Sequence, residues 1–378
     1  MPLGAGLRHC RLHRAGRLAQ RLRRVAPRRV RLAARQLVAQ VAFAERTDDG
    51  ILRQASFLGL REDIPAKSVM DERAQAPPAE KNAVHGIRIS HPERLIWPSL
   101  KITKLGLARY YDGVGERIVP QLARRPLTLV RCPDGAEKKC FYQRHLAMGA
   151  SPGEVKTFKR ERSSKGFYIY IDSHSALLTL VQNGAVELHT WGATGPDVQH
   201  PDRITLDLDP DENLPWAKLV QATRTTRSVV EALQLRSFLK TTGGKGLHVV
   251  IPIQPKLGWP EVKEFSRLIA EFLVRAEPKL FIANVSKERR TQKVFVDYLR
   301  NSETASAVAA FSARARPGAR VSVPLAWDEL IADEDLRPQF TVYTVPQRLA
   351  ALKKDPWADY AKTRQHITAA MWRALGKK

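Results

Sequence analysis

Residues 204–210 (ITLDLDP) constrain the fold more than any other segment of the chain. Apolar and acidic residues alternate there, so in a β-strand Asp207 and Asp209 share one face while Leu206 and Leu208 point into a core. Pro210 then ends the strand and leaves both carboxylates at its rim. Two carboxylates this close repel each other unless a cation lies between them, and hard divalent ions accept such a pair. The segment predicts a core strand with a metal-binding end; an exposed strand end that carries two acids is the alternative.

A glycine-rich loop occupies residues 241–248 (TTGGKGLH). Its glycines let the backbone approach a ligand closely, and neighbouring amides can form an anion-binding nest. Lys245 adds a positive charge and His248 a donor at the start of the next strand. The loop is not a P-loop, because Lys245 is followed by glycine rather than serine or threonine. It predicts a phosphate contact, with a tight hairpin that carries a solvated lysine as the alternative.

The third acidic position is Asp297, in the apolar residues 293–299 (KVFVDYL). An acid within such a strand needs a partner, either a shared metal or a neighbouring arginine. Three strand-borne carboxylates, an anion-binding loop and flanking basic residues are together the parts of two-metal phosphoryl transfer. The sequence therefore predicts a site in which a 3'-hydroxyl group attacks a triphosphate.

The surrounding pattern mixes helices and strands without strict alternation, which is typical of an α+β or mixed α/β domain. Hydrophobic spacing predicts helices at residues 104–121, 216–233 and 261–275. Strands are expected at residues 127–133, 166–172, 237–240 and 247–253, and residues 175–191 read as a helix that runs into a strand. Two further strands joined at Asp48-Asp49-Gly50 are expected within residues 38–60.

The net charge of +25 favours partners rich in phosphate, although arginine enrichment across a GC-rich proteome is an alternative. Arginines are dense between Arg8 and Arg35, and this arm reads equally as a nucleic-acid contact, a transit peptide or a misassigned gene start. Cys10, Cys132 and Cys140 predict neither a disulfide framework nor a paired zinc site, so the chain reads as cytosolic. No apolar run approaches the ~20 residues of a membrane span.

Taken in order, ITLDLDP, TTGGKGLHVV and KVFVDYLRN resemble the polymerase domain of bacterial ATP-dependent DNA ligase D, in the archaeo-eukaryotic primase superfamily. The resemblance runs from about Val84 to Tyr360 and includes HPERLIWP, TKLGLARYY, FYQRH, GAVELHTWG and DPWADY. It implies a primase-polymerase fold of the mixed α/β (α+β) class. A central, largely antiparallel sheet would carry the aspartates, flanked by helices and a smaller N-terminal subdomain.

The resemblance also assigns roles to residues. Two ions, Mn²⁺ by preference or Mg²⁺, would bind the catalytic Asp207, Asp209 and Asp297. Positions expected around the nucleotide are Thr242, Gly243, Gly244, Lys245, His248, His189, Arg290, Tyr142, Phe141 and Arg314. Arg94 and Lys104 would hold the recessed 5'-phosphate of a broken DNA end, with Thr103 as a helix N-cap.

Five regions are expected: an Arg-rich arm (1–35), a remnant of a ligase OB-fold (36–64), a linker (65–82), the polymerase domain (83–365) and a basic tail (366–378). The remnant resembles only the end of a ligase domain. No KxDG lysine is present to carry adenylate, so the chain is not expected to ligate by itself. It looks like a fragment or descendant of a larger repair protein.

The expected function is a metal-dependent nucleotidyltransferase that extends or fills DNA ends in non-homologous end joining. Its partners would be gapped or overhanging DNA with a 5'-phosphate, NTP or dNTP, Ku and a separate ligase, in the bacterial cytoplasm at the nucleoid. A non-catalytic end-binding module that recruits a ligase is the alternative, and a two-metal nuclease is a third interpretation. Clustered acids argue against the module, and the triphosphate loop argues against the nuclease.

Overall fold

The computed structural model describes residues 82–146, 153–159, 167–195, 197–284, 286 and 290–377, and before them the backbone of five short strands. The chain divides into two compact units, Met1–Glu80 and Lys81–Lys378. In the first unit β1 (Arg8–Arg11), β2 (Val38–Ala42) and β5 (Ser56–Leu60) form an antiparallel sheet, and β3 (Glu45–Arg46) pairs with β4 (Leu52–Arg53). The β3–β4 pair flanks the predicted turn at residues 48–50, which lies outside the described residues, as does the predicted linker up to residue 81.

A six-stranded sheet forms one half of the second unit. Its order is β19-β20-β16-β18-β17-β22, and every pair is antiparallel except β19–β20. The strands are β16 (Arg203–Pro210), β17 (Phe238–Thr241), β18 (Leu247–Pro252), β19 (Phe281–Ile282), β20 (Val294–Asp297) and β22 (Pro324–Leu325). Helices α5 (Trp216–Ala232) and α6 (Trp259–Ala276) pack on this sheet in one apolar core, which contains Leu206 and Leu208 as predicted. The mixed fold with a central, largely antiparallel sheet is thus confirmed.

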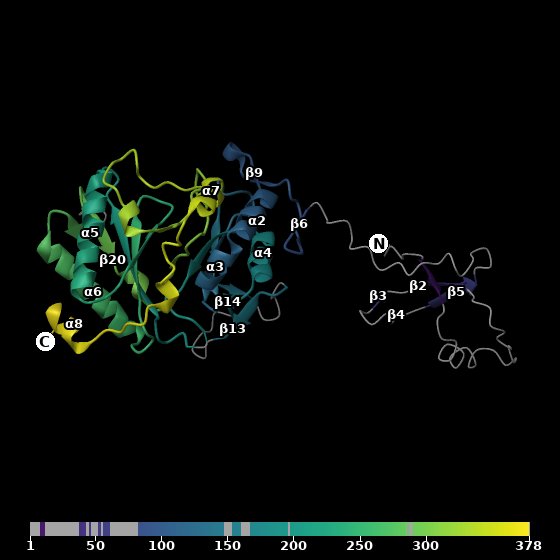
Figure 1. Ribbon diagram of the computed structural model, residues 1–378, viewed down its shortest axis with the longest axis horizontal. Helices are drawn as coiled ribbons and strands as arrows, with labels where there is room; N and C mark the ends of the chain where they lie inside the picture. Colours follow the sequence, from purple (N-terminus) through teal and green to yellow (C-terminus); the bar gives the residue numbers. More distant parts are fainter. Residues whose placement is uncertain are drawn as a thin grey trace. The chain divides into compact units, whose positions relative to one another are not determined.

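The other half is built on a four-stranded sheet of order β11-β10-β15-β21, seen beside the first half in Figure 1. These strands are β10 (Leu127–Arg131), β11 (Phe141–Gln143), β15 (Ala185–Thr190) and β21 (Ala307–Val308). Helices α2 (Lys104–Gly113), α3 (Gly115–Leu122) and α4 (His174–Gln182) share its core. Smaller pieces are β6 (Ala83–Val84), β7 (Ile87–Arg88), β8 (Leu95–Trp97), β9 (Ile102–Thr103), β12 (His145–Leu146), β13 (Lys156–Phe158) and β14 (Phe167–Tyr170).

The helix predicted over residues 104–121 is two helices, α2 and α3, which meet at Val114. Gly113 and Gly115 flank this junction. A glycine in a helix interior costs about 1 kcal/mol of stability relative to alanine. A side chain on Gly115 would also collide with the His174 ring, because its Cβ would lie 2.1 Å from that ring. The N-cap prediction is correct: the Gly106 amide donates to Thr103 Oγ1 at 3.0 Å.

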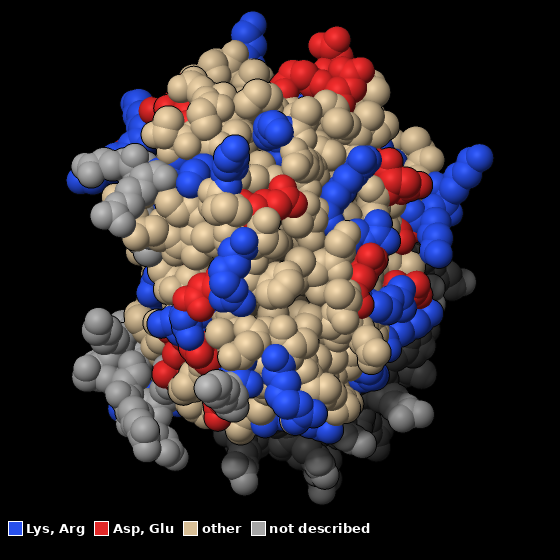
Figure 2. Space-filling model, turned by 90° about the vertical axis from the view of Figure 1, so that its left-hand side faces the viewer, with Lys and Arg blue, Asp and Glu red and all other residues tan. Residues whose placement is uncertain are grey.

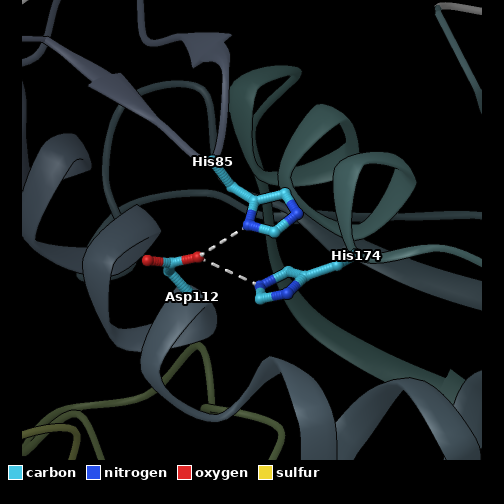
Figure 3. A group of neighbouring side chains, drawn as sticks. All are labelled: His85, Asp112 and His174. Carbon is cyan, nitrogen blue, oxygen red and sulfur yellow. Dashed lines mark ion pairs between the residues drawn. The ribbon is translucent and has the colours of Figure 1, made fainter. Parts of the chain in front are cut away.

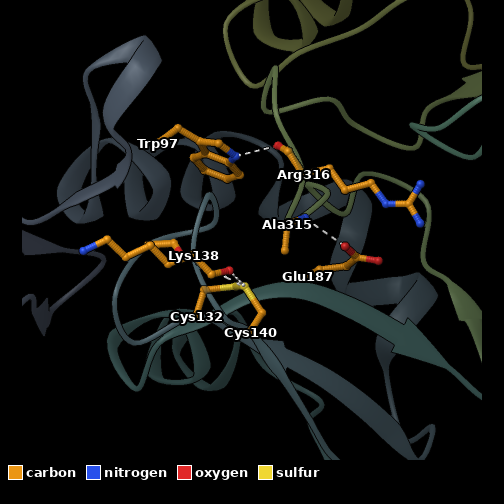
Figure 4. The surroundings of a disulfide bond; sticks show 8 residues. Trp97, Cys132, Lys138, Cys140, Glu187, Ala315 and Arg316 are labelled. Atoms are coloured by element: carbon orange, nitrogen blue, oxygen red, sulfur yellow. Dashed lines mark hydrogen bonds between the residues drawn. A yellow bond between two sulfur atoms is a disulfide. The ribbon is translucent and has the colours of Figure 1, made fainter.

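The prediction that the cysteines form no disulfide is wrong. Cys132 and Cys140 are joined, with their Cα atoms 4.4 Å apart (Figure 4). The cause is the antiparallel β10–β11 pairing, which sets Arg131 opposite Phe141. Cys132 follows Arg131 and Cys140 precedes Phe141, so the two cysteines lie opposite each other. Strand β11 was not among the predicted strands, so the sequence offered no reason to pair these residues.

The C-terminal region crosses both halves through α7 (Thr344–Ala351) and ends in α8 (Ala369–Ala374). Residues 366–378, predicted as a basic tail, include Leu375, which is buried, and Trp372, whose ring lies 5.1 Å from that of Phe265 on α6. In the described part of the chain, no helix has the length and apolar character needed to cross a membrane. Figure 2 shows the side of α5, α6 and α8, where basic and acidic side chains are interspersed rather than gathered by sign.

Candidate active site

Three acidic side chains meet where β16 and β20 lie side by side. Asp207 is the Cα partner of Asp297 on β20 and of His248 on β18, so one residue touches both neighbouring motifs. Asp209 lies two residues further along the same face, at the strand end. The pairing explains why segments about 40 and 90 residues apart in sequence form one site.

Basic side chains surround these carboxylates. The Arg300 Nε atom lies 3.3 Å from Asp207 Oδ2 and 3.2 Å from Asp297 Oδ2. Lys245 Nζ lies 3.6 Å from Asp209 Oδ1, and Arg290 Nη1 lies 3.4 Å from Asp209 Oδ2. The Arg290 guanidinium also stacks over Phe295, 3.8 Å from the ring centre. Each carboxylate thus has a cation within reach, and Arg300 lies between two of them.

The acids differ in proton affinity. Burial raises the pKa of Asp207, but its interactions with His248 and Arg300 outweigh this effect, and the net pKa is lowered. For Asp209, burial and the charge of Asp207 leave the pKa raised despite Lys245. The pKa of Asp297 is raised in the same way, despite Arg300. Two of the three acids therefore still gain from added positive charge, which is the electrostatic behaviour expected of a divalent-cation site.

The glycine loop packs tightly beside the carboxylates. The Thr242 hydroxyl donates to the Gly246 carbonyl at 2.9 Å and accepts from the Gly244 amide at 3.1 Å. Gly243 has a positive φ of 66°, and a Cβ there would lie 2.6 Å from the Arg314 side chain. At Gly246 a Cβ would lie 2.5 Å from the Leu208 carbonyl of β16. The loop needs glycine at these two positions because its backbone packs against Arg314 and β16, and Lys245 projects from it toward Asp209.

Strand β15 supplies a second group of polar residues. Glu187 Oε1 lies 2.6 Å from His189 Nε2 and 2.8 Å from Arg314 Nε, and Glu187 Oε2 accepts from the Ala315 amide at 2.8 Å. Burial raises the pKa of Glu187, but His189 and Arg314 lower it to about 2. Figure 4 shows this hydrogen bond to Ala315 near the Cys132–Cys140 disulfide. Glu187 thereby fixes two of the residues predicted around the nucleotide, His189 and Arg314.

These groups surround one cleft of about 980 Å³. It is lined by Asp207, Asp209, Asp297, Thr242, Gly243, Gly244, Lys245, His248, His189, Arg290 and Arg314, together with Arg300, Arg316 and Arg320. A smaller hollow of about 300 Å³ shares His189, Asp297 and Arg300 with the cleft and adds Tyr142 and Arg144. Phe141 points away from Tyr142 on β11, with the Arg131 guanidinium 5.7 Å from its ring; of the residues predicted around the nucleotide, it alone lines neither space.

Arg94 and Lys104 lie away from the cleft lining, beside the start of α2. Lys104 is buried, and its ammonium donates to the Ser90 carbonyl at 3.0 Å and to the Ser90 hydroxyl at 3.3 Å. Burial and the nearby Arg94 charge lower the pKa of Lys104. Arg94 is exposed and donates to the Pro133 carbonyl at 3.0 Å. The two bases are close neighbours, but only Arg94 is open to solvent.

Comparison with known proteins gives the family. Residues 103–357 match the family described as LigD, primase-polymerase domain. The chain belongs to this family. It is 44% identical over 354 residues to the multifunctional non-homologous end joining protein LigD of Pseudomonas aeruginosa, covering 90% of this chain and 42% of that protein. The LigD of Mycolicibacterium smegmatis is 30% identical over 253 residues, with 66% of this chain and 33% of that protein covered.

A solved structure agrees. The polymerase domain of Mycobacterium tuberculosis ligase D, in complex with DNA, has a TM-score of 0.66 and 29% identity over 72% of this chain and 96% of its own. The chain thus spans less than half the length of the LigD proteins named above. The match to the Pseudomonas protein extends before Lys81, since it covers 90% of the chain. LigD polymerase domains belong to a metal-dependent nucleotidyltransferase family with a place in non-homologous end joining DNA repair.

Sequence reasoning missed three residues that shape the cleft. Arg300 bridges two of the carboxylates, and Glu187 holds His189 and Arg314. Lys240 is buried beside them, and its ammonium donates to Ser322 Oγ at 2.8 Å. Arg300 follows the KVFVDYL segment by one residue, and Glu187 alternates with His189 on one strand. That spacing was the available signal, since residues two apart on a strand face the same way.

Proposed function

We propose that this chain adds nucleotides to the 3'-hydroxyl of a DNA end, and that its cleft is the active site. The observation that carries the proposal is the position of Asp207, paired with both Asp297 and His248 inside a cleft rich in arginine and lysine. Carboxylates suit hard cations, and the basic residues suit a triphosphate. Neither set alone would distinguish a polymerase from a phosphate-binding surface.

Asp207, Asp209 and Asp297 would hold two ions, Mn²⁺ by preference or Mg²⁺. When bound, such ions lower the pKa of an attacking hydroxyl and neutralise charge on a leaving pyrophosphate. On binding, Arg300, Lys245 and Arg290 would exchange their present carboxylate partners for phosphate oxygens. The cations that balance the acids in the free protein thus become triphosphate ligands in the complex.

The remaining residues would orient the substrates. The Thr242–Gly246 turn holds Lys245 beside Asp209, so that the γ-phosphate lies next to the carboxylates. The pKa of His189 is lowered, chiefly by burial, so it would meet the sugar as a neutral imidazole oriented by Glu187. Tyr142 is exposed, and its ring lies 6.3 Å from that of His189, in position to stack near a base. Arg94 and Lys104 would bind the 5'-phosphate beyond a gap.

The comparisons support a DNA partner, because the similar solved structure is a complex with DNA. The relatives' names place them in non-homologous end joining, for which gapped or overhanging ends with a 5'-phosphate, Ku and a ligase are the proposed partners. The chain would then act in the bacterial cytoplasm at the nucleoid, adding ribonucleotides or deoxyribonucleotides and not ligating by itself.

A single assay separates the alternatives. A primer labelled at its 5' end, annealed across a gap, is incubated with the full chain, Mn²⁺ and NTP or dNTP. Extension of the labelled primer is the expected result. A mobility shift without extension would favour a non-catalytic end-binding module, and shortening of the labelled primer would favour a nuclease. Either result would overturn the proposal.

A further inference from the structure

A second cluster of ligating side chains lies outside the cleft. His85 occupies the turn between β6 and β7, Asp112 is on α2, and His174 begins α4; Figure 3 shows the three side chains converging. Their ligand atoms all lie within 4.8 Å of one another. Asp112 Oδ1 is 3.6 Å from His85 Nδ1 and 3.2 Å from His174 Nε2. None of the three lines the cleft, so their juxtaposition needs a separate explanation.

Ordinary hydrogen bonding does not account for this arrangement. His174 Nε2 is buried and has no hydrogen-bond partner among the described residues, although Asp112 Oδ1 lies 3.2 Å from it. A buried polar nitrogen without a partner costs about 1 to 3 kcal/mol. The His174 ring also fills the space over Gly115, where any Cβ would lie 2.1 Å from it. The backbone is thus shaped to hold an imidazole that the protein itself leaves unsatisfied.

The two imidazoles face each other. Their rings stack with centres 4.1 Å apart at 24°. Burial and the neighbouring His85 lower the pKa of His174, while Asp112 and Glu116 act in the opposite direction. A neutral imidazole has a free lone pair, and this is the form in which histidine binds metals.

We propose that His85, Asp112 and His174 form a binding site for Zn²⁺ or a similar divalent transition-metal ion. Two imidazoles and one carboxylate are a frequent zinc ligand set, with water or a further carboxylate as the fourth ligand. Glu116, four residues after Asp112, is the nearby acid that acts on His174. Donor atoms in a tetrahedral zinc site lie about 3.3 Å apart, so the present separations of up to 4.8 Å would shorten, and the stacked rings would turn, when the ion binds.

The ion would differ in kind and purpose from those of the cleft. Carboxylates alone favour Mg²⁺ or Mn²⁺, whereas imidazoles favour Zn²⁺ and its neighbours. The bound ion would tie the β6–β7 hairpin, at the start of the Lys81–Lys378 unit, to α2 and α4. Its effect would be on the stability of this edge of the domain rather than on nucleotide addition, and it stands independently of the proposed polymerase function.

The test measures Zn²⁺ itself on the untagged full chain by equilibrium dialysis with metal analysis. Asp209→Asn/Asp297→Asn removes two of the three cleft carboxylates, and a second control adds saturating Mg²⁺ to the unmutated chain. One Zn²⁺ per chain is expected in both. His85→Gln and His174→Gln should each weaken binding by about 100-fold or more, because a lost ligand costs at least as much as a lost second-sphere contact.

His200→Gln is the matched control, because His200 also pairs with an aspartate, Asp197 at 2.6 Å, but outside the cluster. It should leave zinc binding unchanged. Zinc should raise the thermal midpoint of the Asp209→Asn/Asp297→Asn variant and of His200→Gln, but not of His85→Gln. His85 is exposed, so its variant should fold, which circular dichroism in EDTA checks. Two results would overturn the proposal: loss of zinc binding in the Asp209→Asn/Asp297→Asn variant, or equal zinc binding by His85→Gln and His200→Gln.

Discussion

The cleft and the His85–Asp112–His174 cluster are both candidate metal sites, but they are built in opposite ways. In the cleft, carboxylates project from adjacent strands and each lies near a lysine or arginine. In the cluster, imidazoles come from a turn and a helix start, and the buried His174 nitrogen has no hydrogen bond. Under the two proposals, the cleft would exchange cations during nucleotide addition, whereas the cluster would retain one ion.

The largest expected effect separates the two sites by activity. Asp207→Asn should lower the rate of nucleotide addition by ~10³-fold or more, since it removes a ligand shared by the proposed ions. His85→Gln should leave the rate at the level of the unmutated chain. Single-turnover incorporation on gapped DNA measures the rates, and a binding titration on the same DNA should show little change in either variant. Equal losses in both variants would show that the sites are not independent.

End recognition should produce a smaller effect. Gapped DNA with a 5'-phosphate should bind about ten- to a hundredfold more tightly than the 5'-hydroxyl form, as expected of one charge-assisted contact. Arg94→Ala, which removes the solvent-exposed base, should erase most of this preference and Lys104→Ala part of it, in fluorescence titrations at physiological salt. Lys101→Ala, an exposed neighbour, is the control. A chain that binds both ends equally has no phosphate pocket at this place.

The two acids of β16 should have opposite effects on stability. The lowered pKa of Asp207 means that its charge stabilises the fold above its unfolded pKa, so Asp207→Asn should reduce the metal-free free energy of unfolding by about 3 kcal/mol at neutral pH. The raised pKa of Asp209 means that its charge opposes folding, so Asp209→Asn should not destabilise. Urea unfolding in EDTA compares them, and an equal loss in both would refute this distinction.

His248 should make the stability of the fold depend on pH. Burial and Lys240 lower its pKa from 6.5 to about 4, with Asp207 acting in the opposite direction. Between these values the unfolded chain binds a proton on His248 that the folded chain does not, so stability falls as the pH is lowered through this window. His248→Gln should reduce that fall by about 3 kcal/mol. Urea unfolding from pH 7 to 4 measures it, and an unchanged slope would contradict the assignment.

Local patterns predicted the strands of the cleft, because residues 204–210 alternate clearly and residues 247–253 form an apolar run. Residues 204–210 lie in β16 and residues 247–252 in β18, and Leu206 and Leu208 face the core. The register that sets Asp207 opposite Asp297 depends on pairing across 90 residues of sequence, which the resemblance supplied and periodicity did not. Arg300 was missed for the same reason, since its role depends on where β20 lies.

The His85–Asp112–His174 cluster could not be predicted from local sequence patterns. His85, Asp112 and His174 lie on three separate elements, and no spacing between them resembles a motif. Their meeting depends on the break at Val114, where a continuous helix was predicted, and on the space over Gly115. Cys132 and Cys140 were missed because residues 141–143 were not recognised as a strand.

The central claim is that the cleft carboxylates hold the ions needed for nucleotide addition, and a change of metal preference tests it most directly. Asp209 lies at the strand rim with its side chain 36% exposed, so Asp209→Cys should be accommodated. A thiolate binds Mg²⁺ poorly and thiophilic ions such as Cd²⁺ well. The account predicts that Asp209→Cys, in the presence of a phosphine reductant, loses incorporation with Mg²⁺ and regains part of it with Cd²⁺, whereas Asp209→Ala regains none. Full activity of either variant with Mg²⁺ would contradict it.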